Sequence, residues 1–116
     1  MPCRLVRQRS SVSAAAILAV PLKDTIKELR HGIAARTPDR AQWRAAQTPQ
    51  VFDADLIKAA LTNAINKGLD VTDDCMAVEQ LGAMVHITEG SAGNIKITTK
   101  QDIAIADAIL KTRKFL

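Results

Sequence analysis

The chain has 116 residues, of which 47% are hydrophobic and 24% charged, a composition that is ordinary for a single folded domain. Its net charge is +4, but aromatic residues make up only 3% of the chain, which excludes the basic, stacking surface of a typical nucleic-acid interface. The two cysteines, Cys3 and Cys75, do not have the spacing of a metal site, which favours two reduced thiols.

The chain begins with a basic segment, residues 1–13, that contains Arg4, Arg7 and Arg9 and no acidic residue. We expect this segment to be a disordered tail. Residues 14–20 are a continuous apolar run closed by Pro21, which is typical of a fully buried strand in a parallel sheet. The two segments together also have the outline of a signal or transit peptide. The run is too short to span a membrane, and we expect no membrane partner.

Residues 22–37 mix polar and apolar positions around His31 and Gly32. This pattern fits a short amphipathic helix and equally a two-stranded arm with Gly32 at its turn, so the pattern does not decide between them. The block QTPQ follows at residues 47–50. It is too polar for a core strand and too short for a helix, and Thr48 before Pro49 is typical of a turn.

Two helices are predicted next. Asp53 is a suitable N-cap, and Gly68 a suitable end, for a helix with one apolar face. That face comprises Leu56, Ile57, Ala60, Leu61, Ala64 and Ile65. A shorter helix follows Thr72 and Asp73 and ends at Gly82; its apolar residues are Met76, Val78 and Leu81.

The C-terminal part of the chain predicts a strand over residues 83–88, a loop and a brief extended piece over residues 95–98. Thr99 and Asp102 then form a capping-box pattern at the start of a last helix. Its expected buried face comprises Ile103, Ala106, Ile109 and Leu110. Helices that alternate with short strands predict a layered α/β fold.

Candidate functional residues are polar side chains at the ends of these elements, where α/β folds place their sites. They are Thr25, Arg40, Thr48, Thr72 and Lys96. Each also has a structural explanation: Thr72 as an N-cap, Arg40 as a surface partner of an aspartate (Asp39 or Asp53), Lys96 as a solvated strand residue. The sequence contains no nucleotide-binding glycine motif, metal cluster or recognisable catalytic set. The residues alone predict an α/β domain with an anion site.

Four segments, in this order, resemble the C-terminal half of the 2-C-methyl-D-erythritol 4-phosphate cytidylyltransferase family: AAAILAVPLKDTIKEL, DRAQWRAAQTPQVFDADLIKAAL, GLDVTDDCMAVEQLG and VHITEGSAGNIKITTKQDIAIADAIL. The resemblance implies a Rossmann-like nucleotidyltransferase fold of the nucleotide-diphospho-sugar transferase type. It implies that residues 14–116 are the C-terminal part of that domain, that residues 14–20 form a strand, and that residues of about 22–37 form a dimerisation arm. The resemblance also implies that the QTPQ block belongs to the segment that leads from the arm back to the sheet. In this arrangement Thr48 lies at the carboxyl edge of the sheet and Phe52 lies in the core.

The family joins methylerythritol phosphate to CTP with a divalent metal, Mg²⁺, and releases pyrophosphate in the non-mevalonate route to isoprenoids. The resemblance therefore implies that Thr25, Arg40, Thr48, Thr72 and Lys96 bind methylerythritol phosphate. It also implies a homodimer in which Thr25 and Arg40 serve the partner's site. A cytoplasmic location follows, or a plastid one if the basic N-terminus is the remnant of a transit peptide.

The family's glycine-rich CTP loop and its metal-binding acid belong to an N-terminal half that this sequence does not contain, and residues 1–13 match no family motif that we recognise. We therefore expect a truncated member with no catalytic or metal-binding residue of its own, inactive alone. It would bind CTP only if an N-terminal half is supplied. The alternative hypothesis is a non-catalytic dimerisation module or a decayed fragment.

Overall fold

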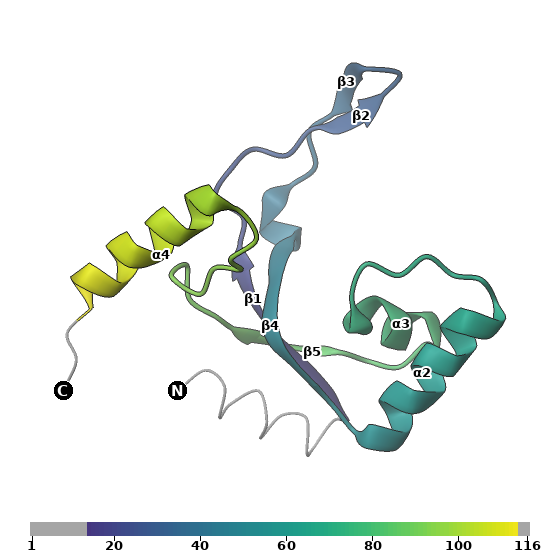
Figure 1. Ribbon diagram of the computed structural model, residues 1–116. Helices are drawn as coiled ribbons and strands as arrows, with labels where there is room; N and C mark the ends of the chain where they lie inside the picture. The colour runs from purple at the N-terminus through teal and green to yellow at the C-terminus, as the bar shows by residue number, and fades with distance from the viewer. Residues whose placement is uncertain (1–13, 114–116) are drawn as a thin grey trace.

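The computed structural model describes residues 14–113, so the predictions for the tail at residues 1–13 and for Cys3 lie outside the described residues. The described chain contains both strands and helices (Figure 1). In order they are β1 Ala15–Pro21, β2 Glu28–Arg30, β3 Ile33–Arg36, the 3₁₀ helix η1 Arg40–Gln42, β4 Arg44–Phe52, α2 Ala54–Asn66, α3 Asp74–Gln80, β5 His86–Glu89 and α4 Lys100–Thr112. Among residues 14–113, no helix combines the length and the apolar character needed to cross a membrane.

The central sheet has three strands in the order β4-β1-β5. Strand β1 lies in the middle, and its residues 15–19 are buried, which confirms the predicted buried strand. It runs parallel to β5, from the pair Ala16–His86 to the pair Ala19–Glu89, and antiparallel to β4. The expectation of a parallel sheet is therefore only half right, because β4 returns from the arm and enters the sheet in the opposite direction.

The QTPQ block lies inside β4, so the expectation that Thr48 lies in a turn is wrong. The strand is at the edge of the sheet and none of its residues is buried, which agrees with the expectation that the block is too polar for a core strand. Residues 47–49 form a β-bulge, since the register passes from the pair Ile17–Gln50 directly to the pair Ala19–Ala46. The Thr48–Pro49 peptide bond within it is cis. A bulge leaves residues unpaired and re-aims their side chains, which allows a polar block to occupy a strand.

The bulge also corrects the position of Thr48. It lies between Ala46 and Gln50, whose partners Ala19 and Ile17 belong to the middle part of β1, and not at the carboxyl edge of the sheet as the resemblance implied. The carboxyl end of β1, at Val20, pairs instead with Ala45, near the start of β4. Because β4 runs antiparallel to β1, the first residues of β4, and not its middle, lie beside the carboxyl end of β1. The position of Thr48 in the sheet therefore could not be read from its position in the chain.

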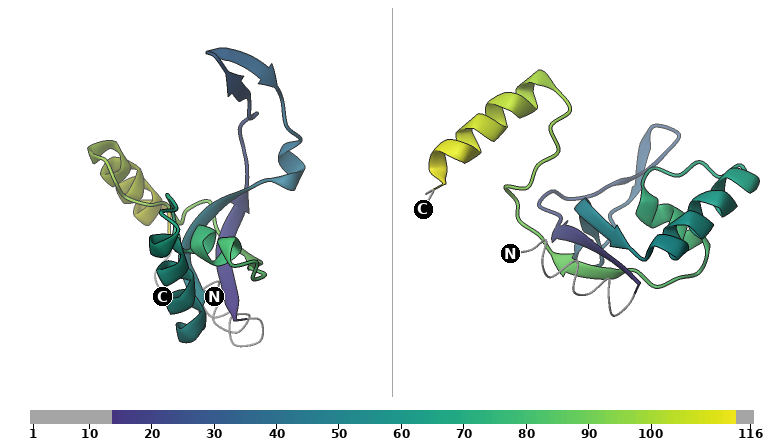
Figure 2. Two further views of the ribbon diagram at one scale, coloured as in Figure 1. Left: turned by 90° about the vertical axis from the view of Figure 1, so that its right-hand side faces the viewer. Right: turned by 60° about the horizontal axis from the view of Figure 1, so that its bottom comes forward.

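Helices α2 and α3 pack on one side of the sheet, and α4 lies on the other side (Figures 1 and 2). The core between the sheet and α2–α3 comprises Ala15, Ala60, Ala64, Ala77 and Val78, with Phe52 packed against it as expected. This core rests on small side chains, each of which buries little apolar area.

The caps of α2 follow the prediction, whereas the cap of α3 differs from it. The Asp53 side chain accepts hydrogen bonds from the backbone N–H groups of Asp55 and Leu56, and Gly68 follows the end of α2 with a φ of 61°. The N-cap of α3 is Asp73, whose side chain accepts from the backbone of Met76. Thr72 is therefore not the cap that its structural explanation assumed.

Helix α4 confirms its predicted capping box but not its predicted buried face. The Asp102 backbone N–H donates to the Thr99 hydroxyl at 3.2 Å, and Asp102 Oδ2 accepts from the Thr99 backbone at 3.0 Å. No residue of α4 is buried, and Ile103 is 60% exposed. The capping box needs only four consecutive residues, whereas a buried face needs a packed neighbour. The piece at residues 95–98, expected to be extended, forms no strand.

The arm is the two-stranded alternative for residues 22–37, with β2 and β3 joined through His31 and Gly32 at φ values of 50° and 77°. Glycine adopts such a backbone without a steric cost, so the turn falls at Gly32. The arm projects away from the sheet (Figure 1).

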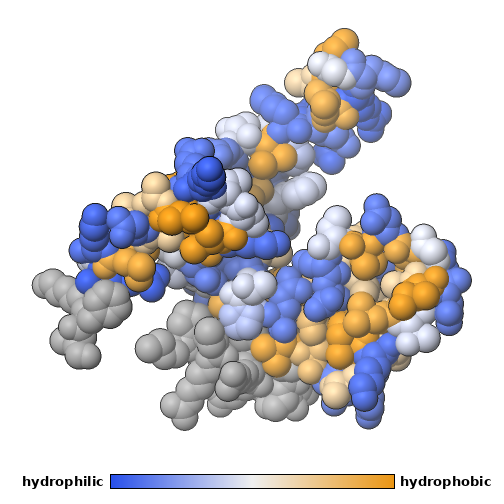
Figure 3. All heavy atoms as spheres, in the orientation of Figure 1, coloured by the Kyte–Doolittle hydropathy of each residue, from blue (hydrophilic) through white to orange (hydrophobic). Residues whose placement is uncertain are grey.

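The chain has a radius of gyration of 16.7 Å, against roughly 13 Å for a compact domain of about 100 residues. Figure 3 shows apolar side chains at the arm tip, on α4 and over α2–α3.

Candidate functional site

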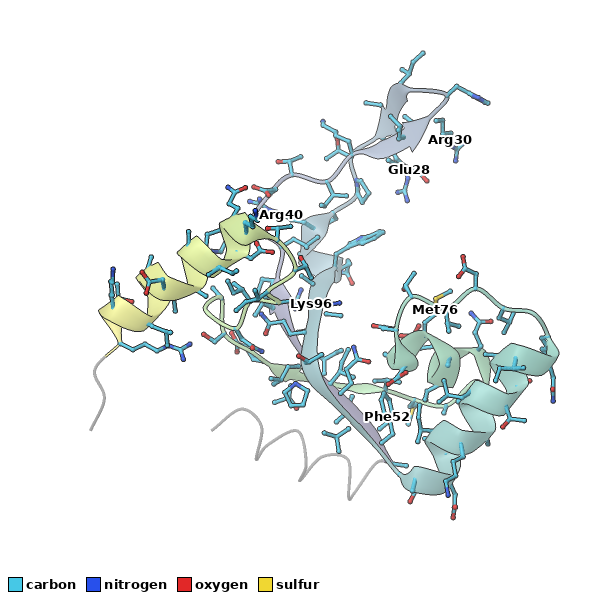
Figure 4. All side chains as sticks on the ribbon, in the orientation of Figure 1. Glu28, Arg30, Arg40, Phe52, Met76 and Lys96 are labelled. Atoms are coloured by element: carbon cyan, nitrogen blue, oxygen red, sulfur yellow. The ribbon has the colours of Figure 1, made fainter. Side chains whose placement is uncertain are left out.

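A cavity of about 820 Å³ opens beside the bulge of β4. Its wall is built from the end of β1 and the residues that follow it, from β4, from the cap of α3 and from the loop between β5 and α4. The polar and charged residues of its lining include Lys23, Asp24, Gln47, Thr48, Gln50, Asp73, Glu89, Asn94 and Lys96. Figure 4 shows Lys96 close to β4, on the loop that leads into α4. The site is therefore assembled from four segments that are distant in sequence.

The structure brings two of the five sequence-predicted residues, Thr48 and Lys96, to this cavity. Thr72 does not line it, but its neighbour Asp73 does, and the Thr72 hydroxyl lies 3.8 Å from the sulfur of Met76. Lys96 is exposed, as its structural explanation assumed, but it belongs to a loop and not to a strand.

Thr25 and Arg40 also lie outside the cavity lining, at the base of the arm. The Arg40 guanidinium donates to the backbone carbonyl of Lys23 at 2.6 Å. This contact, and not the surface pairing with an aspartate that we considered from the sequence, ties Arg40 to a segment that lines the cavity.

Sequence reasoning missed several polar residues of the cavity. Lys23 follows Pro21 at the carboxyl end of β1, a position that the rule for sites in α/β folds would have selected. No sequence rule of this kind selects Gln47, Gln50 or Asn94. Their roles depend on side-chain contacts between segments that lie far apart in the chain, which a local pattern does not contain.

Gln50 and Asp73 form a rigid part of the wall. Gln50 Nε2 donates to Asp73 Oδ2 at 3.0 Å, and the backbone N–H of Cys75 donates to Gln50 Oε1 at 3.2 Å. The other Asp73 oxygen accepts from the backbone of Met76 at 2.8 Å. Both oxygens of Asp73 are thus engaged, and the start of α3 is fixed to β4.

Cys75 does not supply a nucleophile. Its thiol is buried and donates to the carboxylate of Glu79 at 3.4 Å. Burial, followed by this hydrogen bond and the charges of Glu79 and Asp73, raises the pKa of Cys75 to about 12. A thiol with this pKa stays protonated at neutral pH and is chemically inert. Cys75 is free, as predicted for a reduced thiol.

The described carboxylates do not fit a dedicated magnesium site. Within residues 14–113, no group of three or more histidine, cysteine, aspartate or glutamate side chains is placed to hold a metal ion. Asp24, Asp73 and Glu89 line the cavity, but Asp73 already uses both oxygens in hydrogen bonds within the protein.

A family model described as 2-C-methyl-D-erythritol 4-phosphate cytidylyltransferase matches residues 3–112. The protein of that name from Desulforamulus reducens is 47% identical over 110 residues, which are 94% of this chain and 47% of that protein. The protein of that name from Nostoc punctiforme is 49% identical over 98 residues, which are 84% of this chain and 43% of that protein.

Solved structures agree with the sequence relatives. The 2-C-methyl-D-erythritol 4-phosphate cytidylyltransferase from Thermus thermophilus superposes with a TM-score of 0.83 at 33% identity, over 96% of this chain and 55% of that one. The 4-diphosphocytidyl-2C-methyl-D-erythritol synthase from Anaerococcus prevotii gives a TM-score of 0.86 at 33% identity, over 94% of this chain and 49% of that one. These likenesses confirm the predicted nucleotidyltransferase fold class.

The chain spans about half the length of the curated relatives that it matches. The family match begins at residue 3, and so it includes most of the segment that our motif comparison left unmatched. That segment is too rich in serine and arginine, and too poor in distinctive motifs, to be assigned by inspection.

Proposed function

This chain belongs to the 2-C-methyl-D-erythritol 4-phosphate cytidylyltransferase family, and on that premise we propose that its cavity binds the phosphate group of methylerythritol phosphate. The observation that carries the proposal is the convergence of Thr48 and Lys96, from distant segments, on one cavity that Lys23 also lines. An ammonium group offers three donors and a full positive charge, and a hydroxyl offers a further donor to a phosphate oxygen.

Thr72 is proposed as an additional ligand from the rim of the site, and Thr25 and Arg40 are proposed as ligands of the site of a second copy. Arg40 is tied to the backbone of Lys23, which lines the cavity. Thr72 precedes Asp73 at the start of α3. Thr25 and Arg40 lie at the base of the arm, and in a dimer built through the arm they would serve the site of the second copy.

In the proposed reaction, a phosphate oxygen of methylerythritol phosphate attacks the α-phosphorus of CTP. A new phosphorus–oxygen bond forms, the bond from the α-phosphorus to its bridging oxygen breaks, and pyrophosphate leaves with the electron pair. Both reactants are anions, so this chain contributes by holding the attacking phosphate in place and by offsetting its charge with Lys23 and Lys96. The contacts to CTP are proposed to come from residues that this sequence does not contain.

The binding step is tested by calorimetric titration of methylerythritol phosphate into the 116-residue protein. A charge-assisted hydrogen bond contributes about 1.5–3 kcal/mol, so Lys96→Ala is expected to weaken binding roughly 10- to 100-fold. Lys58→Ala is the matched control, because Lys58 is an exposed lysine of α2 that does not line the cavity. A parent protein that does not bind, or a Lys96→Ala variant that binds as tightly as the parent, contradicts the proposal.

A further inference from the structure

Two side-chain amides join the bulge of β4 to the loop that carries Lys96. Gln47 Nε2 donates to the backbone carbonyls of Ser91 at 2.9 Å and Asn94 at 3.1 Å. In return, Asn94 Nδ2 donates to the backbone carbonyl of Thr48 at 2.8 Å and lies 3.5 Å from Gln47 Oε1. We call this pair, Gln47 and Asn94, the amide clamp.

The amide clamp holds the loop on the sheet from the side of the cavity. At the start of the loop, the Gly90 backbone N–H donates to the Ala19 carbonyl at 2.9 Å. Asn94, a member of the clamp, is two residues before Lys96. Thr98 is two residues after Lys96, and its backbone N–H donates to Oδ2 of the capping residue Asp102 at 3.0 Å. The backbone of Lys96 therefore runs between two anchored points, and the clamp connects it to β4, the strand of Thr48.

Gly90 makes room for the clamp. A Cβ atom at this position would collide with Gln47 Oε1, while its approach to Val20 Cγ1 at 3.5 Å is an ordinary contact. The backbone of Gly90 does not adopt the left-handed region, so alanine there would not be strained by its own φ angle. The main consequence of Gly90→Ala is therefore to displace the Gln47 side chain, which makes this substitution a steric probe of the clamp.

We infer that Gln47 and Asn94 are positioning residues, which set the place of Lys96 beside Thr48 and so the affinity of the cavity for a phosphate group. The inference rests on the proposed function of the same cavity. A binding side chain on a loop is effective only if the loop is held in the bound geometry, because a free loop must be ordered when the ligand binds. Loss of the hydrogen bonds of the amide clamp is expected to weaken phosphate binding about tenfold. This loss of affinity should not exceed the loss caused by Lys96→Ala.

The test compares the dissociation constant of methylerythritol phosphate, with inorganic phosphate as a second probe, in the 116-residue protein and its variants. Gln47→Ala and Gly90→Ala are each expected to weaken binding about tenfold. In the Gln47→Ala background, Gly90→Ala is expected to have no further effect, because the side chain that it displaces is gone. In the Lys96→Ala background, Gln47→Ala is expected to add nothing, because the clamp acts through Lys96.

A purely structural role of the clamp would give a different result, namely the same loss of affinity with or without Lys96. That outcome overturns the inference. Asn94→Ala serves as a second variant, which removes the donor to Thr48 without adding a negative charge to the cavity. Amide hydrogen exchange provides an independent readout, and the backbone N–H of Asn94 is expected to exchange faster in Gln47→Ala and in Gly90→Ala.

The two proposals fail in distinguishable ways. If Lys96→Ala weakens binding while Gln47→Ala, Gly90→Ala and Asn94→Ala bind as the parent does, the positioning role is wrong and the proposed function stands. If Lys96→Ala binds as the parent does, or if the parent binds neither probe, both are wrong.

Discussion

Gln50 and Asp73 connect the bulged strand to the start of α3 through a hydrogen bond of 3.0 Å at the wall of the cavity. Asp73 is also the N-cap of α3, and its second oxygen accepts from the backbone of Met76. One carboxylate therefore stabilises a helix end and fixes that helix to the sheet. This double role explains why the helix begins after Asp73 and not after Thr72.

Replacement of Asp73 tests this double role. Loss of an N-cap costs about 0.5–2 kcal/mol, and the Gln50 amide also loses its acceptor, so Asp73→Ala is expected to lower the free energy of unfolding by about 2 kcal/mol. Urea unfolding followed by circular dichroism measures the change. Asp74→Ala is the matched control, because Asp74 is the neighbouring first-turn acid and does not cap α3. Equal destabilisation by the two substitutions would count against the capping role.

The ordering of α4 is expected to depend on pH through Asp102. Hydrogen bonds from the backbone and hydroxyl of Thr98, and then from Thr99, lower the pKa of Asp102 below its ordinary value of 3.8. A carboxyl group with a lowered pKa in the folded state stabilises that state above its unfolded pKa, and the contribution is lost as pH falls through the folded pKa. Amide exchange in α4 is therefore expected to become faster as pH is lowered below about 4, after correction for the intrinsic pH dependence of exchange.

Asp102→Asn separates this effect from general acid unfolding. The variant cannot titrate, so its α4 is expected to be less protected at neutral pH and to show little further change on acidification. Asp107→Asn is the control on the same helix, where the carboxylate pairs with Lys111 at 3.0 Å instead of capping the end. A pH response that persists in Asp102→Asn would show that another group is responsible.

The arm is expected to mediate a homodimer. Leu29 and Ile33 on its two strands are 69% and 71% exposed, and an isolated two-stranded hairpin is at best marginally stable in water. Light scattering of the parent chain is expected to give the mass of a dimer, and the double variant Leu29→Glu, Ile33→Glu that of a monomer. Ile65→Glu is the control, since Ile65 is 79% exposed on α2, away from the arm. A monomeric parent would rule out the arm-mediated dimer.

The polypeptide of these 116 residues is expected not to transfer a cytidylyl group by itself. Its sequence has no glycine-rich phosphate loop, and loss of even one preorganised donor costs about 10²–10³ in rate. We expect no release of pyrophosphate from CTP and methylerythritol phosphate with Mg²⁺ above the uncatalysed rate. Addition of the N-terminal half of a relative is expected to restore release, and Lys96→Ala to abolish the restored activity. Turnover by the polypeptide alone would contradict this expectation.

Several features could be predicted from the sequence because they depend on neighbouring residues. The cap at Asp53, the helix end before Gly68 and the capping box of Thr99 and Asp102 each involve a few consecutive positions, and the structure confirms all of them. The family resemblance could also be recognised directly, since four motifs occur in a fixed order. Periodicity does not decide between a helix and an arm for residues 22–37, whereas the resemblance implies the arm, and the structure contains the two-stranded form.

The tertiary structure alone decided the features that depend on distant partners. The polar block around Thr48 became a strand because pairing with β1 and a bulge accommodate it. The apolar face of α4 is only partly covered, since Ala106 and Ile109 are half-buried whereas Ile103 and Leu110 are exposed. Lys96 lies at the same cavity as Thr48, and hydrogen bonds of Gln47 and Asn94 join the two distant segments that carry them. Local sequence determines where an element starts and ends, but side-chain packing between distant segments determines which of its residues meet.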